Sequence, residues 1–278
     1  MHAFITGVAV WGPGLAGWAA SAPVLAGRQD YAAGEMPLPP PTLLPATERR
    51  RAPVTVRLAL TVAQQAMAMA GETIGGVRSV FGSGNGDGAV LHAILEELAK
   101  PEPQVSPTQF HNSVHNAAAG YWTIATASHE AATSLGCHDA TFAAALLKAV
   151  AELRVEGKPV LLCVYDAPFP EPLATARPIA AAFAAGFVLV PEPTERALMR
   201  IEIGYRAAAP DPATEAPLQG ALRALWRGNP AARALRLLEH IARGEAGVAS
   251  AGLLDGRIDI GMQPCRLNEL CQSDNSIP

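Results

Sequence analysis

The sequence predicts an α/β layered fold in which helices flank a buried mixed sheet, and three observations lead to this prediction. Short apolar segments alternate along the 278 residues with longer helical segments rich in alanine and leucine. Most of the short segments are apolar throughout, as expected of strands that are covered on both faces. Half of the residues are hydrophobic and only 17% are charged, so the chain can bury a sizeable core.

The first predicted strand covers residues 3–10 and is followed by the sequence WGPG, which is typical of a turn. The segment 199–205 alternates between apolar and polar residues, which predicts a half-buried strand. The other predicted strands cover residues 77–81, 132–135, 159–165, 186–190 and 257–262.

Helices are predicted where the chain between these strands is long and rich in helix formers. The segment 54–70 has no charged residue after Arg57, which predicts a helix buried against its neighbours. The segment 36–45 is rich in proline, so we expect a surface loop there rather than a helix or a central strand. The other predicted helices are one that follows a glycine cluster and ends at residue 98, and those over residues 114–127, 139–154, 178–184, 217–226 and 231–243.

Composition and charge exclude several classes of protein. The net charge of -4 argues against nucleic-acid binding as a main role. Residues 1–27 lack lysine and arginine, and glycines interrupt their apolar run, so they do not match a secretory signal peptide. The longest later apolar run, residues 179–190, is well short of the roughly 20 residues that span a bilayer. We therefore expect a cytoplasmic protein without a membrane span.

The cysteines and histidines do not indicate a metal or a cofactor. Cys137, Cys163, Cys265 and Cys271 lack metal-ligand spacing and are too few for a disulfide scaffold, so we expect reduced thiols. His111 and His115 have the spacing of two ligands on one helix, but no third ligand is near them in the sequence. We expect an interface or a hydrogen-bonded core role for this histidine segment.

The glycine cluster over residues 82–88 lies between a predicted strand and a predicted helix, where phosphate groups are often bound. The cluster has neither a Gly-Lys-Ser/Thr sequence nor the glycine spacing of dinucleotide-binding folds. It therefore predicts a tight strand-to-helix turn instead of a nucleotide site.

Cys137 lies between a short strand and a helix that is predicted to start at Asp139. The positive end of a helix dipole favours a thiolate, so this position suits a nucleophile on a strand-to-helix elbow. A small buried cysteine is the other interpretation, because burial is the commonest environment of free cysteine. The residues alone leave both interpretations open.

Seven segments, taken in order, resemble the N-terminal half of a β-ketoacyl-acyl-carrier-protein synthase of the thiolase-like superfamily. They are FITGVAVWGPG, RAPVTVRLALTVAQQAM, VFGSGNGD, HNSVHNAAAGYWTIAT, TSLGCHDATFAAALLKAVAEL, PVLLCVYDAP and AAFAAGFVLVPE. The resemblance implies a ketosynthase-like domain over residues 1–205 and a short divergent extension over 206–265. Residues 266–278 are polar, and we predict that they form a disordered tail.

Two departures from the synthase pattern argue against condensation by this chain alone. Synthases usually have Thr-Ala-Cys-Ala/Ser-Ser-Gly at the elbow, whereas this chain has LGCHDA at residues 135–140. A full synthase also has a second half with two histidines, and the residues after Tyr205 are too few for that half. Removing a single donor that stabilises an oxyanion can cost roughly 3–4 kcal/mol.

Short chains with a segment like HNSVHNAAAGYW resemble the chain-length-factor-like proteins of aryl polyene, polyketide and type II fatty acid systems. This resemblance implies a subunit that forms a heterodimer with a full-length ketosynthase and shapes its acyl tunnel. The candidate interface residues are Phe110, His111, Asn112, Ser113, His115, Asn116, Tyr121, Trp122 and Phe142.

Two alternatives stay open. In the first, Cys137 accepts an acyl group, with His138 or His111 as its base. In the second, the chain is a homodimer without catalytic activity that binds acyl-carrier protein through a local basic patch around residues 49–51 or around Arg57.

Overall fold

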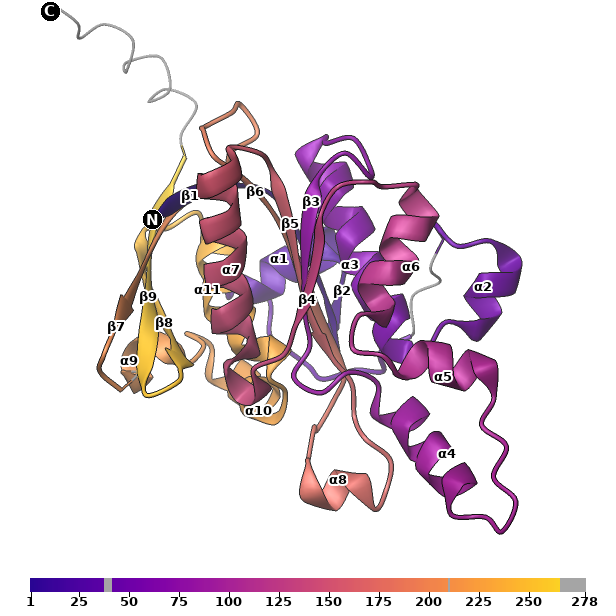
Figure 1. Cartoon of the computed structure of the whole chain (residues 1–278). Helices are drawn as coiled ribbons and strands as arrows, with labels where there is room; N and C mark the ends of the chain where they lie inside the picture. Colours follow the sequence, from indigo (N-terminus) through magenta and orange to yellow (C-terminus); the bar gives the residue numbers. More distant parts are fainter. Residues whose placement is uncertain (38–41, 210, 266–278) are drawn as a thin grey trace, which may run out of the picture.

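A computed structural model describes residues 1–37, 42–209 and 211–265. One mixed sheet runs through the molecule in the strand order β4-β3-β5-β6-β1-β7-β9-β8, with the short strand β2 paired to β1 (Figure 1). β3 is parallel to β4 and β5, and the other pairs are antiparallel. The strands are β1 (His2–Gly12), β2 (Leu15–Ala16), β3 (Arg78–Gly82), β4 (Ala132–Leu135), β5 (Val160–Asp166), β6 (Phe183–Val190), β7 (Met199–Arg206), β8 (Gly247–Leu253) and β9 (Gly256–Pro264).

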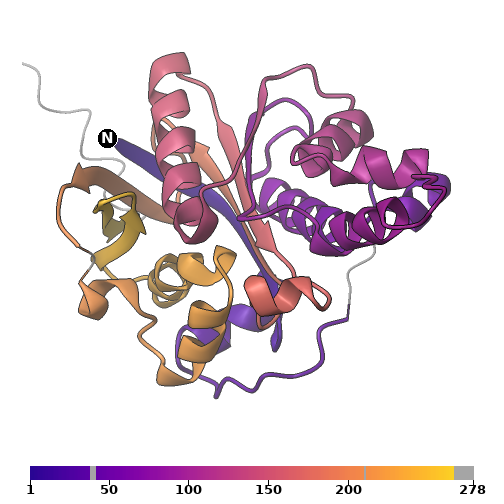
Figure 2. The ribbon, with the colours of Figure 1, turned by 60° about the horizontal axis from the view of Figure 1, so that its bottom comes forward.

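Helices cover both faces of the sheet and enclose two hydrophobic cores. α3 and α6 cover one face, and α7, α11 and α1 lie over the other, with the strands between these layers (Figure 2). The longer helices are α1 (Trp18–Leu25), α3 (Val54–Ala70), α4 (Gly88–Leu98), α6 (Ala117–Thr126), α7 (Thr141–Glu156) and α11 (Leu235–Arg243). The short helices are α2 (Ala46–Arg51), α5 (Pro107–Ser113), α8 (Leu173–Ala176), α9 (Pro212–Glu215), α10 (Arg223–Gly228) and the 3-10 turns η1 (His138–Ala140), η2 (Gly220–Leu222) and η3 (Ala231–Ala234).

α3 packs unusually close to the middle of the sheet. A Cβ atom added to Gly7 on β1 would lie 2.1 Å from the carbonyl oxygen of Ala66, and one added to Gly186 on β6 would lie 2.6 Å from that of Val62. Glycine at both positions therefore lets the α3 backbone rest on these two strands.

The predicted fold class is confirmed, and α3 and β4 have the bounds predicted from the sequence. The helix predicted over residues 178–184 is wrong, because residues 178–182 form a loop and β6 begins at Phe183. The helix predicted over 114–127 starts too early, because Val114 has an extended backbone with φ -71° and ψ 140°. α6 therefore begins at Ala117, and the separate helix α5 precedes it.

The segment after residue 206 continues the same sheet. β9 pairs with β7 along eight residues, and β8 forms a hairpin with β9. The hairpin brings the end of β8 close to η1 and α7. The polar tail predicted over residues 266–278 lies outside the described residues.

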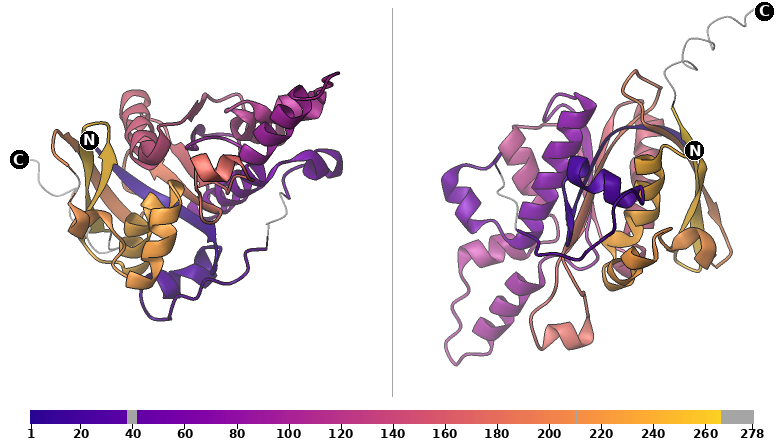
Figure 3. Two further views of the ribbon diagram at one scale, coloured as in Figure 1. Left: turned by 90° about the horizontal axis from the view of Figure 1, so that it is seen from below. Right: turned by 180° about the vertical axis from the view of Figure 1, so that it is seen from behind.

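α4 and α8 project from the end of the sheet where β3 and β5 finish, as the views from below and behind show (Figure 3). This end carries the loops that follow three neighbouring parallel strands, β3, β4 and β5. Open α/β sheets bind ligands at the carboxyl ends of such strands. This end of the sheet is therefore the expected position of a functional site.

Candidate functional site

Cys137 occupies a strand-to-helix elbow directly after β4. Its backbone N–H donates to Thr141 Oγ1 at 2.9 Å, and the Thr141 hydroxyl donates to the carbonyl oxygen of His138 at 2.7 Å. His138 has a left-handed backbone conformation with φ 52°. This conformation is sterically unfavourable for residues other than glycine. The two hydrogen bonds hold this turn, so the partly exposed Cys137 lies at the N-terminal end of η1 and α7.

The glycine cluster forms the predicted turn between β3 and α4, and it touches the elbow. A Cβ atom on Gly84 would lie 3.1 Å from the carbonyl oxygen of His138. Asp87 caps α4 by accepting from the Val90 N–H at 3.0 Å, and it also accepts from the Thr55 hydroxyl at 2.7 Å. The turn is thus fixed to α3 on one side and to the elbow on the other.

Asp166, the last residue of β5, accepts two hydrogen bonds from the glycine turn. Its Oδ1 accepts from the Ser83 hydroxyl at 3.0 Å and from the Gly84 N–H at 2.8 Å, whereas Oδ2 has no hydrogen-bond partner among the described residues. Burial raises the pKa of Asp166 to about 7, although both hydrogen bonds favour the ionised form. The carboxyl group therefore changes charge near neutral pH.

Arg177 connects three loops at this end of the sheet. Its Nη2 donates to Asp139 Oδ1 at 2.7 Å, and its Nε reaches the side-chain oxygen of Asn85 at 2.9 Å in the amide orientation that satisfies both groups. Burial raises the pKa of Asp139, but the hydrogen bond and the charge of Arg177 outweigh burial, so the net shift is downward. Asp139 is therefore ionised near neutral pH.

The structure separates the two histidines that the sequence places at helical spacing. His111, on α5, packs edge-on against Tyr121 with 5.6 Å between the ring centroids. His115 lies beyond the break at Val114, and its Nε2 is 3.0 Å from the carbonyl oxygen of Ser83. A Cβ atom on Gly136 would lie 2.9 Å from that nitrogen. His115 therefore lies at the elbow, next to the residue that precedes Cys137.

His138 and His111 have different surroundings from those a general base for Cys137 would need. The His138 side chain is 66% exposed, and its Nδ1 is 3.5 Å from Asp139 Oδ2. Within the part of the chain that the structure describes, no histidine ring hydrogen-bonds to the Cys137 thiol. In the same part of the chain, no three His, Cys, Asp or Glu side chains form a group that could hold a metal ion.

The aromatic residues of the predicted interface divide into exposed and buried side chains. Phe110 is 65% exposed, whereas Tyr121, Trp122 and Phe142 are buried in the cores of this chain. Asn112 is buried as well, donating to the carbonyl oxygen of Arg51 at 3.0 Å and accepting from the Tyr121 hydroxyl at 3.1 Å. Ser113 is the last residue of α5, where its hydroxyl donates to the carbonyl oxygen of Phe110, and Asn116 directly precedes α6.

Sequence reasoning missed Asp166, Arg177 and Arg233, all of which lie at or near the elbow. Asp166 had a usable signal, because an acidic residue directly follows an otherwise apolar buried strand. Arg177 had none, because its partner Asp139 lies 38 residues away in the sequence; Arg233 lies only seven residues from Trp226, but nothing in the sequence indicates that it faces a cavity.

Comparisons with known proteins agree with this geometry. Residues 24–221 match the family described as "Beta-ketoacyl synthase, N-terminal domain". No curated protein matches the chain. None of the described helices is both long enough and apolar enough to cross a membrane.

Several solved structures share the fold at low sequence identity. One is "Ketosynthase (ApeO) in Complex with its Chain Length Factor (ApeC) from Xenorhabdus doucetiae", with 20% identity, a TM-score of 0.71, and coverage of 94% of this chain and 99% of that chain. A β-ketoacyl synthase from Burkholderia phymatum STM815 has 14% identity, a TM-score of 0.67, and coverage of 95% and 100%.

The structure titled "The ishigamide ketosynthase/chain length factor" has 15% identity, a TM-score of 0.67, and coverage of 94% of this chain and 99% of that chain. The family match spans well over half of the sequence, and the TM-scores of these structures indicate the same overall fold. The chain belongs to the β-ketoacyl synthase N-terminal domain family.

Proposed function

We propose that this chain is a chain-length-factor-type subunit, which docks on a full-length ketosynthase and shapes the space for its growing acyl chain. Type II fatty acid, aryl polyene or polyketide synthesis is the setting that fits this role. The similar structures support the proposal, because two of them are titled as a ketosynthase with a chain length factor. The sequence resemblance to short chain-length-factor-like proteins supports the same role.

An exposed apolar face beside an unpaired sheet edge carries the proposal. We call it the α5–α6 face, and it consists of Phe110, Val114, Ile124 and the outer edge of β4. Phe110 is 65% exposed and Ile124 is 73% exposed. Among the described strands, β4 pairs only with β3, so its other edge offers free backbone groups. Large exposed apolar side chains beside a free edge are typical of an interface with another protein chain.

The elbow supports a role other than condensation. Decarboxylative condensation needs hydrogen-bond donors that stabilise an oxyanion beside the nucleophile, and each such donor is worth roughly 3–4 kcal/mol. Among the described residues, no histidine ring hydrogen-bonds to the Cys137 thiol, and the charged group nearest in sequence, Asp139, is an acceptor that is already paired with Arg177. The described residues around Cys137 therefore offer no imidazole donor that would stabilise an oxyanion there.

Binding to the full-length ketosynthase of the source organism tests the proposal. Phe110→Glu and Ile124→Glu should each weaken binding by tenfold or more, because a carboxylate would be buried in an apolar contact, at a cost of about 2 kcal/mol or more. Val155→Glu is the matched control. Val155 is also an exposed apolar residue (83%), but it lies near the C-terminal end of α7 and does not belong to the α5–α6 face. Equal affinities for all three variants and the wild type would contradict the proposed face.

A second candidate function follows from the partial exposure of Cys137 at the start of a helix. In this function, the Cys137 thiolate attacks an acyl thioester, the carrier thiolate leaves, and the acyl group stays on Cys137. Intact mass after incubation with an acyl-carrier-protein thioester should then rise by one acyl group, and Cys137→Ala should not gain mass. Cys163 is an internal reference, because burial raises the pKa of its thiol far above the ordinary range.

A basic segment on α2 favours acyl-carrier protein as a further partner, whether the chain is a heterodimer or a homodimer. Arg50 and Arg51 are exposed there, beside a cavity of about 420 Å³ that Leu44, Tyr121 and Ile124 help to line. Carrier proteins are acidic, so Arg50→Glu should weaken their binding most at low salt. Arg28→Glu, at an exposed site away from α2, is the control.

A further inference from the structure

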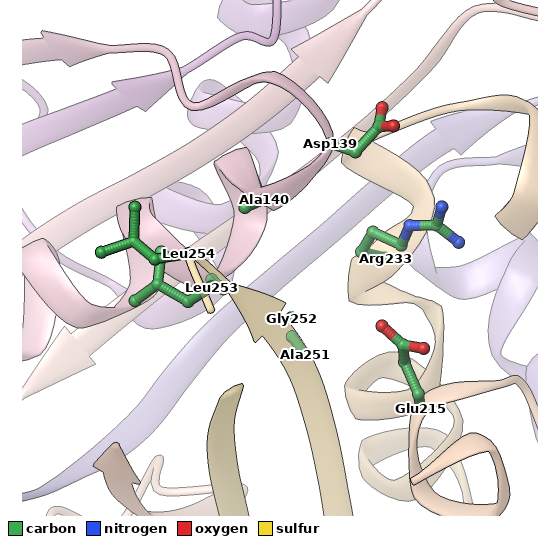
Figure 4. A pocket seen from close by; sticks show the side chains of 9 residues that line it. Asp139, Ala140, Glu215, Arg233, Ala251, Gly252, Leu253 and Leu254 are labelled. Atoms are coloured by element: carbon green, nitrogen blue, oxygen red, sulfur yellow. The ribbon is translucent and has the colours of Figure 1, made fainter. Parts of the chain in front are cut away.

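The C-terminal extension lines one side of an open cavity beside the elbow, and η1 and α7 line another side (Figure 4). Its volume is about 230 Å³, larger than the roughly 150 Å³ that holds a benzene molecule in an engineered protein cavity. The lining residues share no single element and come from η1, α7, α9, η3 and the β8–β9 hairpin: Asp139, Ala140, Ala143, Glu215, Arg233 and residues 251–254. The cavity is therefore large enough for a small organic molecule.

Arg233 on η3 is the principal polar group of this cavity. Its guanidinium carbon lies 4.3 Å from the centre of the Trp226 ring, which supports it from one side. Within the described residues the guanidinium group forms no hydrogen bond and no ion pair, and its Nη1 atom is shielded from solvent. A guanidinium carries five N–H donors, and leaving buried donors without acceptors is costly. A ligand in the cavity could therefore supply the hydrogen-bond acceptors that Arg233 lacks.

The charged residues that line the cavity, together with Arg177 behind Asp139, sum to zero. Asp139 is already paired with Arg177 at 2.7 Å. In Figure 4, the Arg233 guanidinium lies between the carboxylates of Asp139 and Glu215, at the end of the cavity away from Leu253 and Leu254. With Asp139 paired to Arg177, the carboxylate of Glu215 compensates the charge of Arg233. An anionic or cationic ligand would leave one charge uncompensated in a partly buried site.

We propose that this cavity binds a small neutral carboxamide. Its carbonyl oxygen accepts from the Arg233 guanidinium, and its N–H donates to the Glu215 carboxylate. Its apolar part rests against Leu253 and Leu254, which lie at the end of the cavity away from Arg233 (Figure 4). The ligand binds without covalent change, and the site does not depend on the proposed role as a chain-length-factor-type subunit.

Titration with N-acetylglycine N-methylamide tests this site on the full chain by ¹H–¹⁵N correlation spectra. We expect saturable shifts of the backbone amides of residues 251–254 and of Ala140 and Ala143. Arg233→Met should weaken this binding by roughly tenfold or more, because a hydrogen bond to a charged group is lost. Arg243→Met is the matched control, because Arg243 is also partly buried but does not line the cavity, and its affinity should equal that of the wild type.

A second variant keeps the test independent of any folding defect in Arg233→Met. Glu215→Gln leaves the charge of Arg233 uncompensated, so it should bind the N-acetylglycine anion roughly tenfold more tightly than the wild type does. The proposal is overturned if the wild type binds N-acetylglycine as tightly as the methylamide. It is also overturned if Arg243→Met loses as much affinity as Arg233→Met, or if no saturable shift appears at residues 251–254.

Discussion

The ionisation of Asp166, which accepts hydrogen bonds from the glycine turn, makes the stability of the chain depend on pH. Burial raises its pKa from 3.8 to about 7 in the folded chain, so between these values the folded state keeps a proton that the unfolded state has lost. The free energy of unfolding therefore falls as pH rises through this window. A raised pKa of this size corresponds to a loss of up to about 4 kcal/mol.

Asp166→Asn removes this titration but keeps an oxygen that can accept from Ser83 and Gly84. We predict that the stability of the wild type relative to Asp166→Asn falls steadily between pH 4 and pH 7 and levels off above it. Chemical denaturation at several pH values measures this difference, in which groups common to both proteins cancel. A difference that stays constant with pH would show that Asp166 titrates normally.

Arg177 controls the ionisation of Asp139 at the elbow, since its hydrogen bond and charge together lower the pKa of that carboxyl group. Arg177→Met should raise the pKa of Asp139 towards the ordinary value, because the remaining desolvation favours the protonated form. Carboxyl ¹³C chemical shifts followed against pH measure this pKa. Arg28→Met should leave it unchanged, and an unchanged pKa in Arg177→Met would contradict the described pairing.

At the scale of single residues, the sequence located the elbow but could not assign its neighbours. His111 and His115 look equivalent in the sequence, yet the extended backbone of Val114 sends only His115 to the Ser83 carbonyl. Trp122 and Phe142 were candidates for an interface, and their burial in the cores shows that aromatic type alone does not indicate exposure.

At the scale of elements, a buried ion cluster ties α7 to β3. Glu152 on α7 accepts from Arg78 Nε at 2.6 Å and from Lys148, and its side chain is almost fully buried. Desolvation raises the pKa of Glu152, but hydrogen bonds from Lys148 and Arg78 lower it by more. The carboxylate is therefore charged and paired inside the protein.

Glu152→Ala should destabilise the chain by about 3 kcal/mol, because Arg78 then loses its short hydrogen bond to a buried carboxylate. Glu156→Ala is the control, since Glu156 pairs with the same arginine at 3.6 Å but is exposed, and it should cost less than about 1 kcal/mol. Urea denaturation of both variants measures the two values. Equal values would contradict the distinction between the buried and the exposed pair.

The contact between α3 and β1 makes a second prediction about elements. Gly7→Ala places a Cβ atom 2.1 Å from a backbone oxygen of α3, so the helix or the strand must move. We expect a loss of about 3 kcal/mol or more. Gly204→Ala, on β7, meets no atom within 4 Å and should be nearly neutral, and thermal unfolding compares the two variants. Similar melting temperatures would contradict the close packing of α3.

Elements were predicted well where a single pattern determines them. The long apolar segment 54–70 forms the predicted helix, because its pattern and its burial against the sheet agree. Residues 178–184 have helical composition but lead into β6, where pairing with β1 and β5 outweighs local preference. β8 was missed because its sequence, GVASAGL, is rich in glycine and alanine, and it forms a strand only by pairing with β9.

At the scale of the whole molecule, sequence order and family resemblance determined the fold class, but they left the role of the C-terminal residues open. The structure shows that these residues extend the sheet through β9 and β8 and line one side of the cavity next to the elbow. The position of Arg233 beside residues 251–254 depends on this distant pairing and could not be found from spacing. β4 is the edge strand on the other side of the sheet from β8. Its free edge lies there, with the exposed side chains of the α5–α6 face.

The central claim is that this chain acts as the partner of a full-length ketosynthase. Native mass spectrometry of the chain, purified after co-expression with the ketosynthase of its source organism, tests this claim most directly. We predict a complex with one copy of each subunit, which Phe110→Glu and Ile124→Glu disrupt and Val155→Glu preserves. A chain that remains entirely monomeric or pairs only with itself in the presence of that ketosynthase would contradict the claim.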